Sequence, residues 1–200
     1  IAIQAALIAR EKTGHGQQVD MALFDCMTGV LANQAMNFLA SGKAPRRLGN
    51  AHPNIAPYQT FPVADGHLIV ACGNDGQFAR LAAVLGLPEL AADARFSTNA
   101  ARVGNRLDLS AVMEERTRGW KRDDLLAALE KEGVPAGPIN TVADVFDDPQ
   151  FLHRAMRIEP EGVSGIRTPI RFSDSELELS HGAPVLGAHT AEILRELEGK

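Results

Sequence analysis

The sequence of 200 residues has little cysteine, few aromatic side chains and no long apolar run. Its two cysteines, Cys26 and Cys72, both lie in apolar stretches. We therefore expect buried free thiols rather than a disulfide, as in a protein of the reducing cytoplasm. Two cysteines and six scattered histidines give no metal-ligand spacing, so no metal is expected. No run approaches the roughly 18 apolar residues of a membrane-spanning helix, so no membrane partner is expected.

The chain also lacks an excess of positive charge. Its formal net charge is −5, with 45% hydrophobic and 22% charged residues, as in ordinary globular proteins. Binding to duplex nucleic acid needs clustered Lys and Arg, so a nucleic-acid partner is not expected.

The chain does not begin with Met. It opens on an apolar stretch, residues 1–9, that is typical of the middle of a buried helix and has no capping residue before it. The basic segment and cleavage site of a signal peptide are missing. We therefore expect these residues to be the carboxyl part of a longer protein.

The first 43 residues are expected to form a helix, a strand and a second helix. Residues 1–13 are apolar nearly all round and end at Gly14, a typical left-handed helix cap. Residues 18–23 alternate as a strand would, and residues 25–41 carry an apolar helical stripe with Asp25 available as N-cap. A mostly apolar strand between two helices indicates a covered parallel sheet.

A linker and a hairpin come next. Three prolines within residues 43–57 and two adjacent arginines, Arg46 and Arg47, mark residues 44–56 as a linker that is either solvated or lines a phosphate-binding cleft. The pair Asp65-Gly66 predicts a hairpin turn between strands 58–63 and 67–72. Phe78, Leu81, Ala82 and Leu85 then repeat at helical spacing, which predicts a helix over residues 77–85 with these side chains on its inward face.

The rest of the chain is predicted to be mainly helical. Helices are expected at 99–117, with Val103 and Leu107 on the apolar stripe, and at 122–132. A final helix is expected at 190–197, with Ile193, Leu194 and Leu197 facing inward. Thr141 and Asp148 are expected to cap two short helices. Residues 133–138 and 157–173 are extended or strand-like.

Five motifs, in order along nearly the whole chain, resemble the class III CoA-transferases of the formyl-CoA transferase, carnitine dehydratase and bile acid-inducible protein F type. The resemblance implies an α/β fold, with part of a Rossmann-like large domain and a smaller α+β domain. It places a large-domain segment at 1–43, the linker at 44–56, the small domain at 57–148, and the return to the large domain at 149–200. The motifs are residues 10–20, 50–78, 133–139, 147–150 and 186–190.

The activity that this resemblance implies is transfer of CoA between an acyl-CoA and a carboxylic acid, with CoA as a substrate. An aspartate attacks the thioester and covalent aspartyl intermediates follow. In relatives this aspartate precedes the helix that matches residues 1–13, so the expected nucleophile lies before Ile1. Asp20 and Asp25 follow that helix and do not match it. The resemblance also implies a cytoplasmic homodimer of two interlocked rings.

Substrate-binding residues are expected in two polar loops, because ligands of α/β proteins bind at loops beyond strand ends. One loop follows the second hairpin strand and meets a helix N-terminus, where free N–H groups favour an anion or a carbonyl oxygen. The alternative is a tight turn with Asn74 or Asp75 as an N-cap. The glycine repeat of formyl-CoA transferases is missing there, so gating by that loop is not implied. The candidates are His52, Asn54, Tyr58, Gly73, Asn74 and Asp75.

Two other functions remain open. The first is an α-methylacyl-CoA racemase or isomerase of the same fold. Racemases tend to carry Ile-Glu-Pro-Gln-Phe where this chain has Asn-Asp-Gly-Gln-Phe at 74–78, which favours a transferase. The second is a truncated, non-catalytic domain that binds a partner chain.

Overall fold

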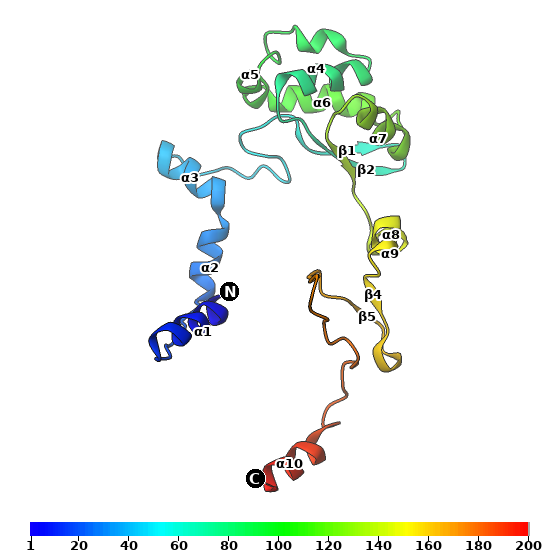
Figure 1. Cartoon of the computed structure of the whole chain (residues 1–200). Helices are drawn as coiled ribbons and strands as arrows, with labels where there is room; N and C mark the ends of the chain where they lie inside the picture. Colours follow the sequence, from blue (N-terminus) through cyan, green and yellow to red (C-terminus); the bar gives the residue numbers. More distant parts are fainter. Residues whose placement is uncertain (200) are drawn as a thin grey trace. The chain divides into compact units, whose positions relative to one another are not determined.

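A computed structural model describes residues 1–199 of the chain (Figure 1). Contacts divide the chain into two units, Ile1–Gly137 and Pro138–Lys200, and each is described by itself. The four predicted domain segments stay a prediction. The first unit contains, in chain order, α1 (Ala2–Thr13), α2 (Leu23–Val30), α3 (Ala32–Ser41), β1 (Tyr58–Val63), β2 (Gly66–Ala71), α4 (Asp75–Val84), η1 (Pro88–Ala91), α5 (Asn99–Gly104), α6 (Arg106–Thr117), α7 (Arg122–Lys131) and the start of β3 (Ala136–Pro138).

The predicted hairpin is confirmed. Strands β1 and β2 pair antiparallel, and β3 extends the sheet in the order β1-β2-β3. Val63 pairs with Gly66, so the turn is made by Ala64 and Asp65, one residue earlier than predicted. The Asp65 carboxylate accepts a 2.7 Å hydrogen bond from the N–H of Arg122, which joins the turn to the start of α7.

The outer edge of β1 is protected by side chains instead of a further strand. Asn50 accepts a 2.9 Å hydrogen bond from the N–H of Thr60 and donates its amide to the Thr60 hydroxyl at 2.6 Å. The hydroxyl of Thr117 donates to the carbonyl of Pro62 at 2.7 Å. Pro62 has no N–H to offer, which suits an edge position. This edge therefore has no row of free groups that would pair with another strand.

One core lies between the hairpin and the helices α4, α6 and α7 (Figure 1). The predicted inward face of α4 is confirmed. Trp120 packs partly buried against this core. Among the fully or nearly fully buried residues are Phe61, Leu68, Val70, Phe78, Leu81, Leu109, Met113, Leu125 and Leu129.

The single helix predicted over residues 99–117 is wrong, because Asn105 separates α5 from α6. The break changes which positions face inward. Leu107, predicted to lie on the apolar stripe, is 83% exposed, whereas Leu109 is buried. Arg102 in α5 is also buried, although its charge argued for the surface.

The amino-terminal segment differs from the predicted helix, strand and helix. Residues 18–22 have no regular structure and Leu23 begins α2, so the predicted strand over 18–23 is wrong. A strand needs a neighbouring strand for its backbone N–H and C=O groups, and none of the described residues pairs there. The predicted helix over 25–41 is two helices, separated by Leu31, and α3 begins at Ala32, whose φ is 44°.

Two residue predictions in this segment also fail. Asp25 lies inside the first turn of α2, whose N-cap is Ala22, so Asp25 does not cap the helix. Cys26 is exposed, whereas Cys72 is buried as predicted. None of the residues of α1, α2 and α3 is buried, and their apolar faces are open in the described chain. The left-handed cap at Gly14 is confirmed, with φ 76°.

The second unit is mostly loop and short elements: α8 (Val142–Asp147), α9 (Pro149–His153), β4 (Arg157–Ile158), η2 (Pro160–Gly162), β5 (Gly165–Ile166) and α10 (Thr190–Glu198). The predicted caps are confirmed, since Thr141 and Asp148 accept hydrogen bonds from the first turns of α8 and α9. Strands β4 and β5 pair antiparallel, so only part of 157–173 is strand. In α10, Ile193, Leu194 and Leu197 were predicted to face inward but are exposed in the described chain.

Candidate substrate-binding loops

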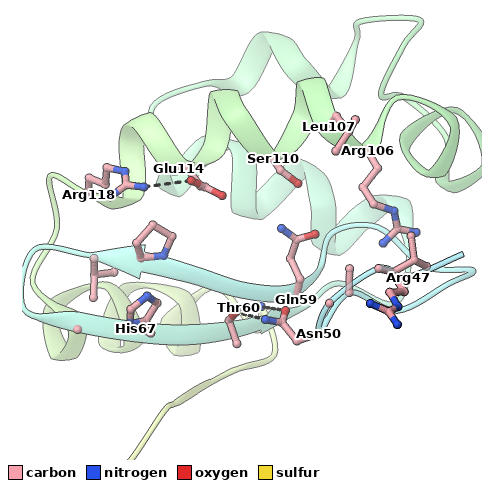
Figure 2. Close-up of a pocket in the computed structure, with 16 residues that line it drawn as sticks. Arg47, Asn50, Gln59, Thr60, His67, Arg106, Leu107, Ser110, Glu114 and Arg118 are labelled. Carbon is pink, nitrogen blue, oxygen red and sulfur yellow. Dashed lines mark hydrogen bonds and ion pairs between the residues drawn. The ribbon is translucent and has the colours of Figure 1, made fainter.

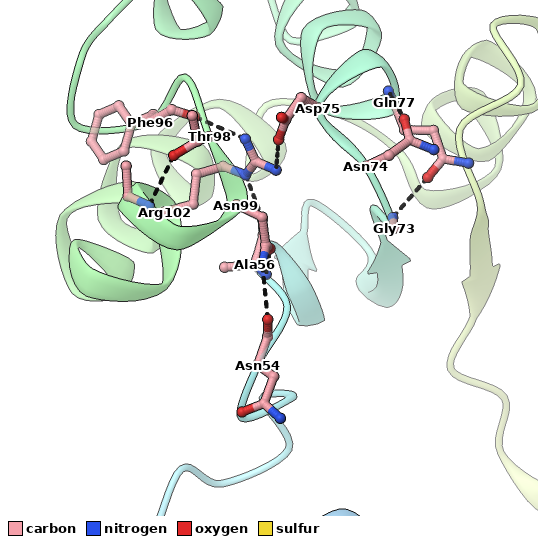
Figure 3. Close-up of polar contacts among 11 residues, drawn as sticks. Asn54, Ala56, Gly73, Asn74, Asp75, Gln77, Phe96, Thr98, Asn99 and Arg102 are labelled. Carbon is pink, nitrogen blue, oxygen red and sulfur yellow. Dashed lines mark hydrogen bonds and ion pairs between the residues drawn. The ribbon is translucent and has the colours of Figure 1, made fainter. Parts of the chain in front are cut away.

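The loop after β2 is closed by the side chain of Gln77 (Figure 3). Asn74 is the N-cap of α4 and accepts a 2.9 Å hydrogen bond from the N–H of Gln77. The Gln77 side chain in turn accepts one of 2.7 Å from the N–H of Gly73. The capping role that the sequence left open is therefore the one that Asn74 performs, and residues 73–76 stay exposed around it.

Asp75 forms an ion pair with a buried arginine, Arg102. Its carboxylate accepts a 2.7 Å hydrogen bond from Nη2 of Arg102, whose side chain has no exposed surface. Nε and Nη1 of Arg102 donate to the carbonyls of Ala56 and Phe96 at 2.6 and 2.9 Å. The guanidinium also lies over the ring of Phe78, 4.5 Å from its centroid. Arg102 thus connects the loop at residues 73–76 with the loop that ends at Tyr58.

That second loop is ordered by His52. Its half-buried ring stacks on the ring of Tyr58, with centroids 5.2 Å apart and planes 10° from parallel. Nδ1 of His52 accepts a 3.2 Å hydrogen bond from the N–H of Asn54, which assigns the ring proton of the neutral form to Nε2. The N–H of His52 donates to the carbonyl of Tyr58 at 2.9 Å.

Two asparagines hold the middle of this loop. The amides of Asn54 and Asn37, which lies in α3, exchange two hydrogen bonds of 3.0 and 3.1 Å. Asn99 donates to the carbonyl of Asn54 at 2.9 Å and accepts from the N–H of Ala56 at 3.1 Å. These contacts come from α3 and α5, far along the chain in both directions.

The two loops offer groups that can bind a substrate, and their own side chains do not form a catalytic nucleophile. The N–H groups of Asp75 and Gly76, at the start of α4, have no acceptor among the described residues and are exposed. Such groups can donate to a negative or polarised oxygen. Burial raises the pKa of the Cys72 thiol to about 12, so this nearby cysteine stays protonated and is no nucleophile.

The predicted candidates fall into two groups: His52, Asn54 and Tyr58 share one loop, and Gly73, Asn74 and Asp75 share the other. Arg102, which the sequence did not point to, joins the two loops. Asn37 and Asn99, also not predicted, hold the first loop alone. Among residues 1–199 no three His, Cys, Asp or Glu side chains gather as they would around a metal ion, and no helix is long and apolar enough to cross a membrane.

This chain is similar in sequence to a protein family and to several named enzymes. A family model described as CoA-transferase family III matches residues 1–190. A succinate–glutarate CoA-transferase of Agrobacterium fabrum is 49% identical over 202 residues, which cover 98% of this chain and 50% of that protein. The human succinyl-CoA:glutarate CoA-transferase is 38% identical over 201 residues, covering 98% and 46%.

A solved structure agrees with these matches. The crystal structure of a CAIB/BAIF family protein from Brucella suis is 68% identical, with a TM-score of 0.83, and the match covers 98% of this chain and 52% of that one. The predicted α/β fold is thereby confirmed. This chain spans about half the length of the curated relatives that it matches.

Proposed function

Because this chain belongs to CoA-transferase family III, we propose that the whole protein moves CoA from an acyl-CoA to a free carboxylate. The observation that carries the proposal is the family match over residues 1–190, together with 49% identity to a succinate–glutarate CoA-transferase. The substrates are then a CoA thioester and a carboxylic acid. Succinyl-CoA and glutarate are the first pair to test.

The proposed chemistry uses an aspartate that lies before the residue matching Ile1. Its carboxylate attacks the thioester carbonyl, the C–S bond breaks, and the CoA thiolate leaves. The thiolate then attacks the aspartyl carbonyl, which releases the donor acid and leaves CoA on the aspartate. The acceptor carboxylate repeats the two steps in reverse, so that the aspartate is regenerated and a new acyl-CoA forms.

In this proposal the six candidate residues of the two loops bind substrate. The exposed N–H groups of Asp75 and Gly76 would donate to the oxygen that becomes negative when the thioester is attacked. The ion pair with Arg102 offsets the charge of the Asp75 carboxylate, which would otherwise repel that oxygen. The stacked rings of His52 and Tyr58 would form a wall beside the acyl group.

The test is an assay of the full-length protein with succinyl-CoA and glutarate. We expect glutaryl-CoA and succinate in equal amounts, measured by chromatography. A parallel reaction with a 2-methylacyl-CoA deuterated at C2 tests for a racemase, which would exchange the deuterium. Deuterium exchange without CoA transfer would show that the protein is a racemase and not a transferase. If neither reaction occurs, the non-catalytic interaction domain is the function that remains.

Substitution of Asn74 by Ala in the full-length protein separates binding from folding. We expect KM for the acyl-CoA to rise about fivefold or more, because the loop and its N–H groups lose their cap. Thr98→Ala is the matched control, since Thr98 caps α5 by the same kind of bond, at 3.2 Å. Both variants should lose about 1 kcal/mol of stability. Equal KM values in the two variants would show that Asn74 does not contribute to substrate binding.

His52→Ala gives a second test of the same site. It removes the stack on Tyr58 and the acceptor for Asn54, so the same rise in KM is expected with little change in kcat.

We further propose a cytoplasmic homodimer that needs no metal. Loss of activity with a chelator and its recovery with zinc would contradict the proposal that no metal is needed. Sedimentation measures the number of subunits and so tests the homodimer.

A further inference from the structure

A polar cavity lies in the first unit, between the outer edge of β1 and α6, apart from the two candidate loops (Figure 2). Its volume is about 870 Å³, within the range of small-molecule sites. None of the six candidate substrate residues lines it. The polar residues on its walls that matter here are Arg47, Gln59, Arg106, Ser110, Glu114 and Arg118.

The charge of this cavity is unbalanced. Three arginines line it, and Glu114 is the one acidic residue among its lining residues. Glu114 already pairs with Arg118, at 3.2 Å. Arg47 is exposed and has no hydrogen bond or ion pair with any described residue. Arg47 and Arg106 therefore present two positive charges without a carboxylate to offset them.

Arg106 is only partly satisfied. Nη2 donates to the carbonyl of Pro53 at 3.1 Å, whereas Nη1 is buried and has no partner within the described chain. Burial lowers the pKa of Arg106, yet an arginine keeps its charge at neutral pH. A buried donor without an acceptor is rare in native proteins and indicates an acceptor from outside the chain.

We propose that this cavity binds the phosphate group of a small molecule, held by Arg47 and Arg106. A phosphate monoester carries close to two negative charges, which match the two unpaired guanidinium groups. Its three terminal oxygens can accept the forked N–H groups of both arginines at once. Gln59 and Ser110, which face each other across the cavity in Figure 2, add neutral donors and have no partners among the described residues.

Two sources share this chemistry: a phosphate of CoA and free inorganic phosphate. The free-phosphate source goes beyond the proposed transferase activity and the CoA source rests on it, and the phosphate titration itself uses no acyl substrate. Inorganic phosphate is titrated into the full-length protein at constant ionic strength and followed by calorimetry. Arg47→Ala should weaken binding about tenfold or more, because a charge-assisted hydrogen bond is lost.

Arg46→Ala is the matched control. Arg46 is the adjacent residue, is exposed like Arg47 and does not line this cavity, although it lines a neighbouring one together with Arg47 and Arg106. Its loss should change phosphate affinity by less than about twofold, since it makes no contact in this cavity and its exposed charge is screened. Ser110→Ala should weaken binding by a few-fold through one lost neutral hydrogen bond.

The CoA arm assigns the source. Competition between CoA and phosphate, abolished in Arg47→Ala, identifies a CoA phosphate as the ligand, and independent binding of both identifies free phosphate. Three results would overturn the proposal: no saturable phosphate binding below about 20 mM, equal losses in the Arg46 and Arg47 variants, or tighter Arg47-dependent binding of succinate than of phosphate.

Discussion

Replacing Arg102 with Met tests how much of the first unit depends on one buried guanidinium. The side chain has no exposed surface, and each of its three nitrogens donates a hydrogen bond of 2.6 to 2.9 Å. Met keeps an apolar stem of comparable length but leaves the carbonyls of Ala56 and Phe96 without donors. Both residues are buried, and each orphaned acceptor costs about 1–3 kcal/mol.

The ion pair should contribute less than these two carbonyls. The Asp75 side chain is 56% exposed, so water can replace the Arg102 that it loses, and the loss costs little at that end of the pair. We therefore expect Arg102→Met to lower the free energy of unfolding by about 3–5 kcal/mol. Asp75→Asn, which keeps all the buried bonds of Arg102 to carbonyls, should lower it by about 1 kcal/mol or less.

Trp120 provides the assay, because it is the one tryptophan of the 200-residue chain and packs against the core of the first unit. Urea unfolding of this chain, followed by tryptophan fluorescence, should show the midpoint of Arg102→Met lowered by more than about 1 M. Arg95→Met is the control. Arg95 also lies over an aromatic ring and pairs with Asp93 at 2.7 Å, but its side chain is 58% exposed, and its midpoint should not move.

An Arg102→Met midpoint within about 0.3 M of the wild-type value would contradict this prediction, since the carbonyls would then have found other donors. Equal instability of Asp75→Asn and Arg102→Met would contradict it too. That result would assign the stabilisation to the ion pair instead of the carbonyls.

Three further predictions concern other buried groups. Because burial raises the pKa of Cys72 from 9.0 to about 12, the thiol stays protonated while its unfolded form ionises, so stability should fall between pH 9 and pH 12. The slope should be up to about 1.4 kcal/mol per pH unit, and Cys72→Ala should abolish it. A thiol reagent should label the exposed Cys26 at once and Cys72 only after urea is added; two fast thiols would contradict the buried site. Asn99→Ala should cost about 1–3 kcal/mol in the same urea assay, since the buried N–H of Ala56 loses its acceptor.

The elements that the sequence predicted correctly are those whose signals are local. A helix cap needs a side chain and an N–H two or three residues away, so Asn74, Thr141 and Asp148 could be recognised from neighbouring residues. The hairpin likewise follows from one pair of turn residues between two apolar runs. The inward face of α4 required only its 3.6-residue period.

The errors arise where the outcome depends on distant parts of the chain. Leu107 was placed inside because a continuous helix was assumed, and one break at Asn105 rotated the later positions. Residues 18–22 alternate like a strand, yet alternation cannot supply the neighbouring strand that a sheet requires. Arg102 was missed because its partner Ala56 lies 46 positions earlier. The available signal was an arginine within the apolar run Ala100-Ala101-Arg102-Val103, which indicates a buried charge with fixed partners.

Arg102 and Arg106 hold the same loop, but they differ in how many of their guanidinium nitrogens donate hydrogen bonds within the protein. Arg102 donates to the carbonyl of Ala56 and Arg106 to that of Pro53, so both ends of the segment between His52 and Tyr58 depend on α5 and α6. Every nitrogen of Arg102 is used within the protein, and its loss should therefore be felt mainly in folding. Nη1 of Arg106 stays buried and has no partner among residues 1–199. An anion that binds this group would act on the arginine that also holds the loop of the candidate residues His52, Asn54 and Tyr58. We therefore expect occupancy of the cavity beside α6 to be coupled, through Arg106, to the acyl-CoA binding proposed for that loop.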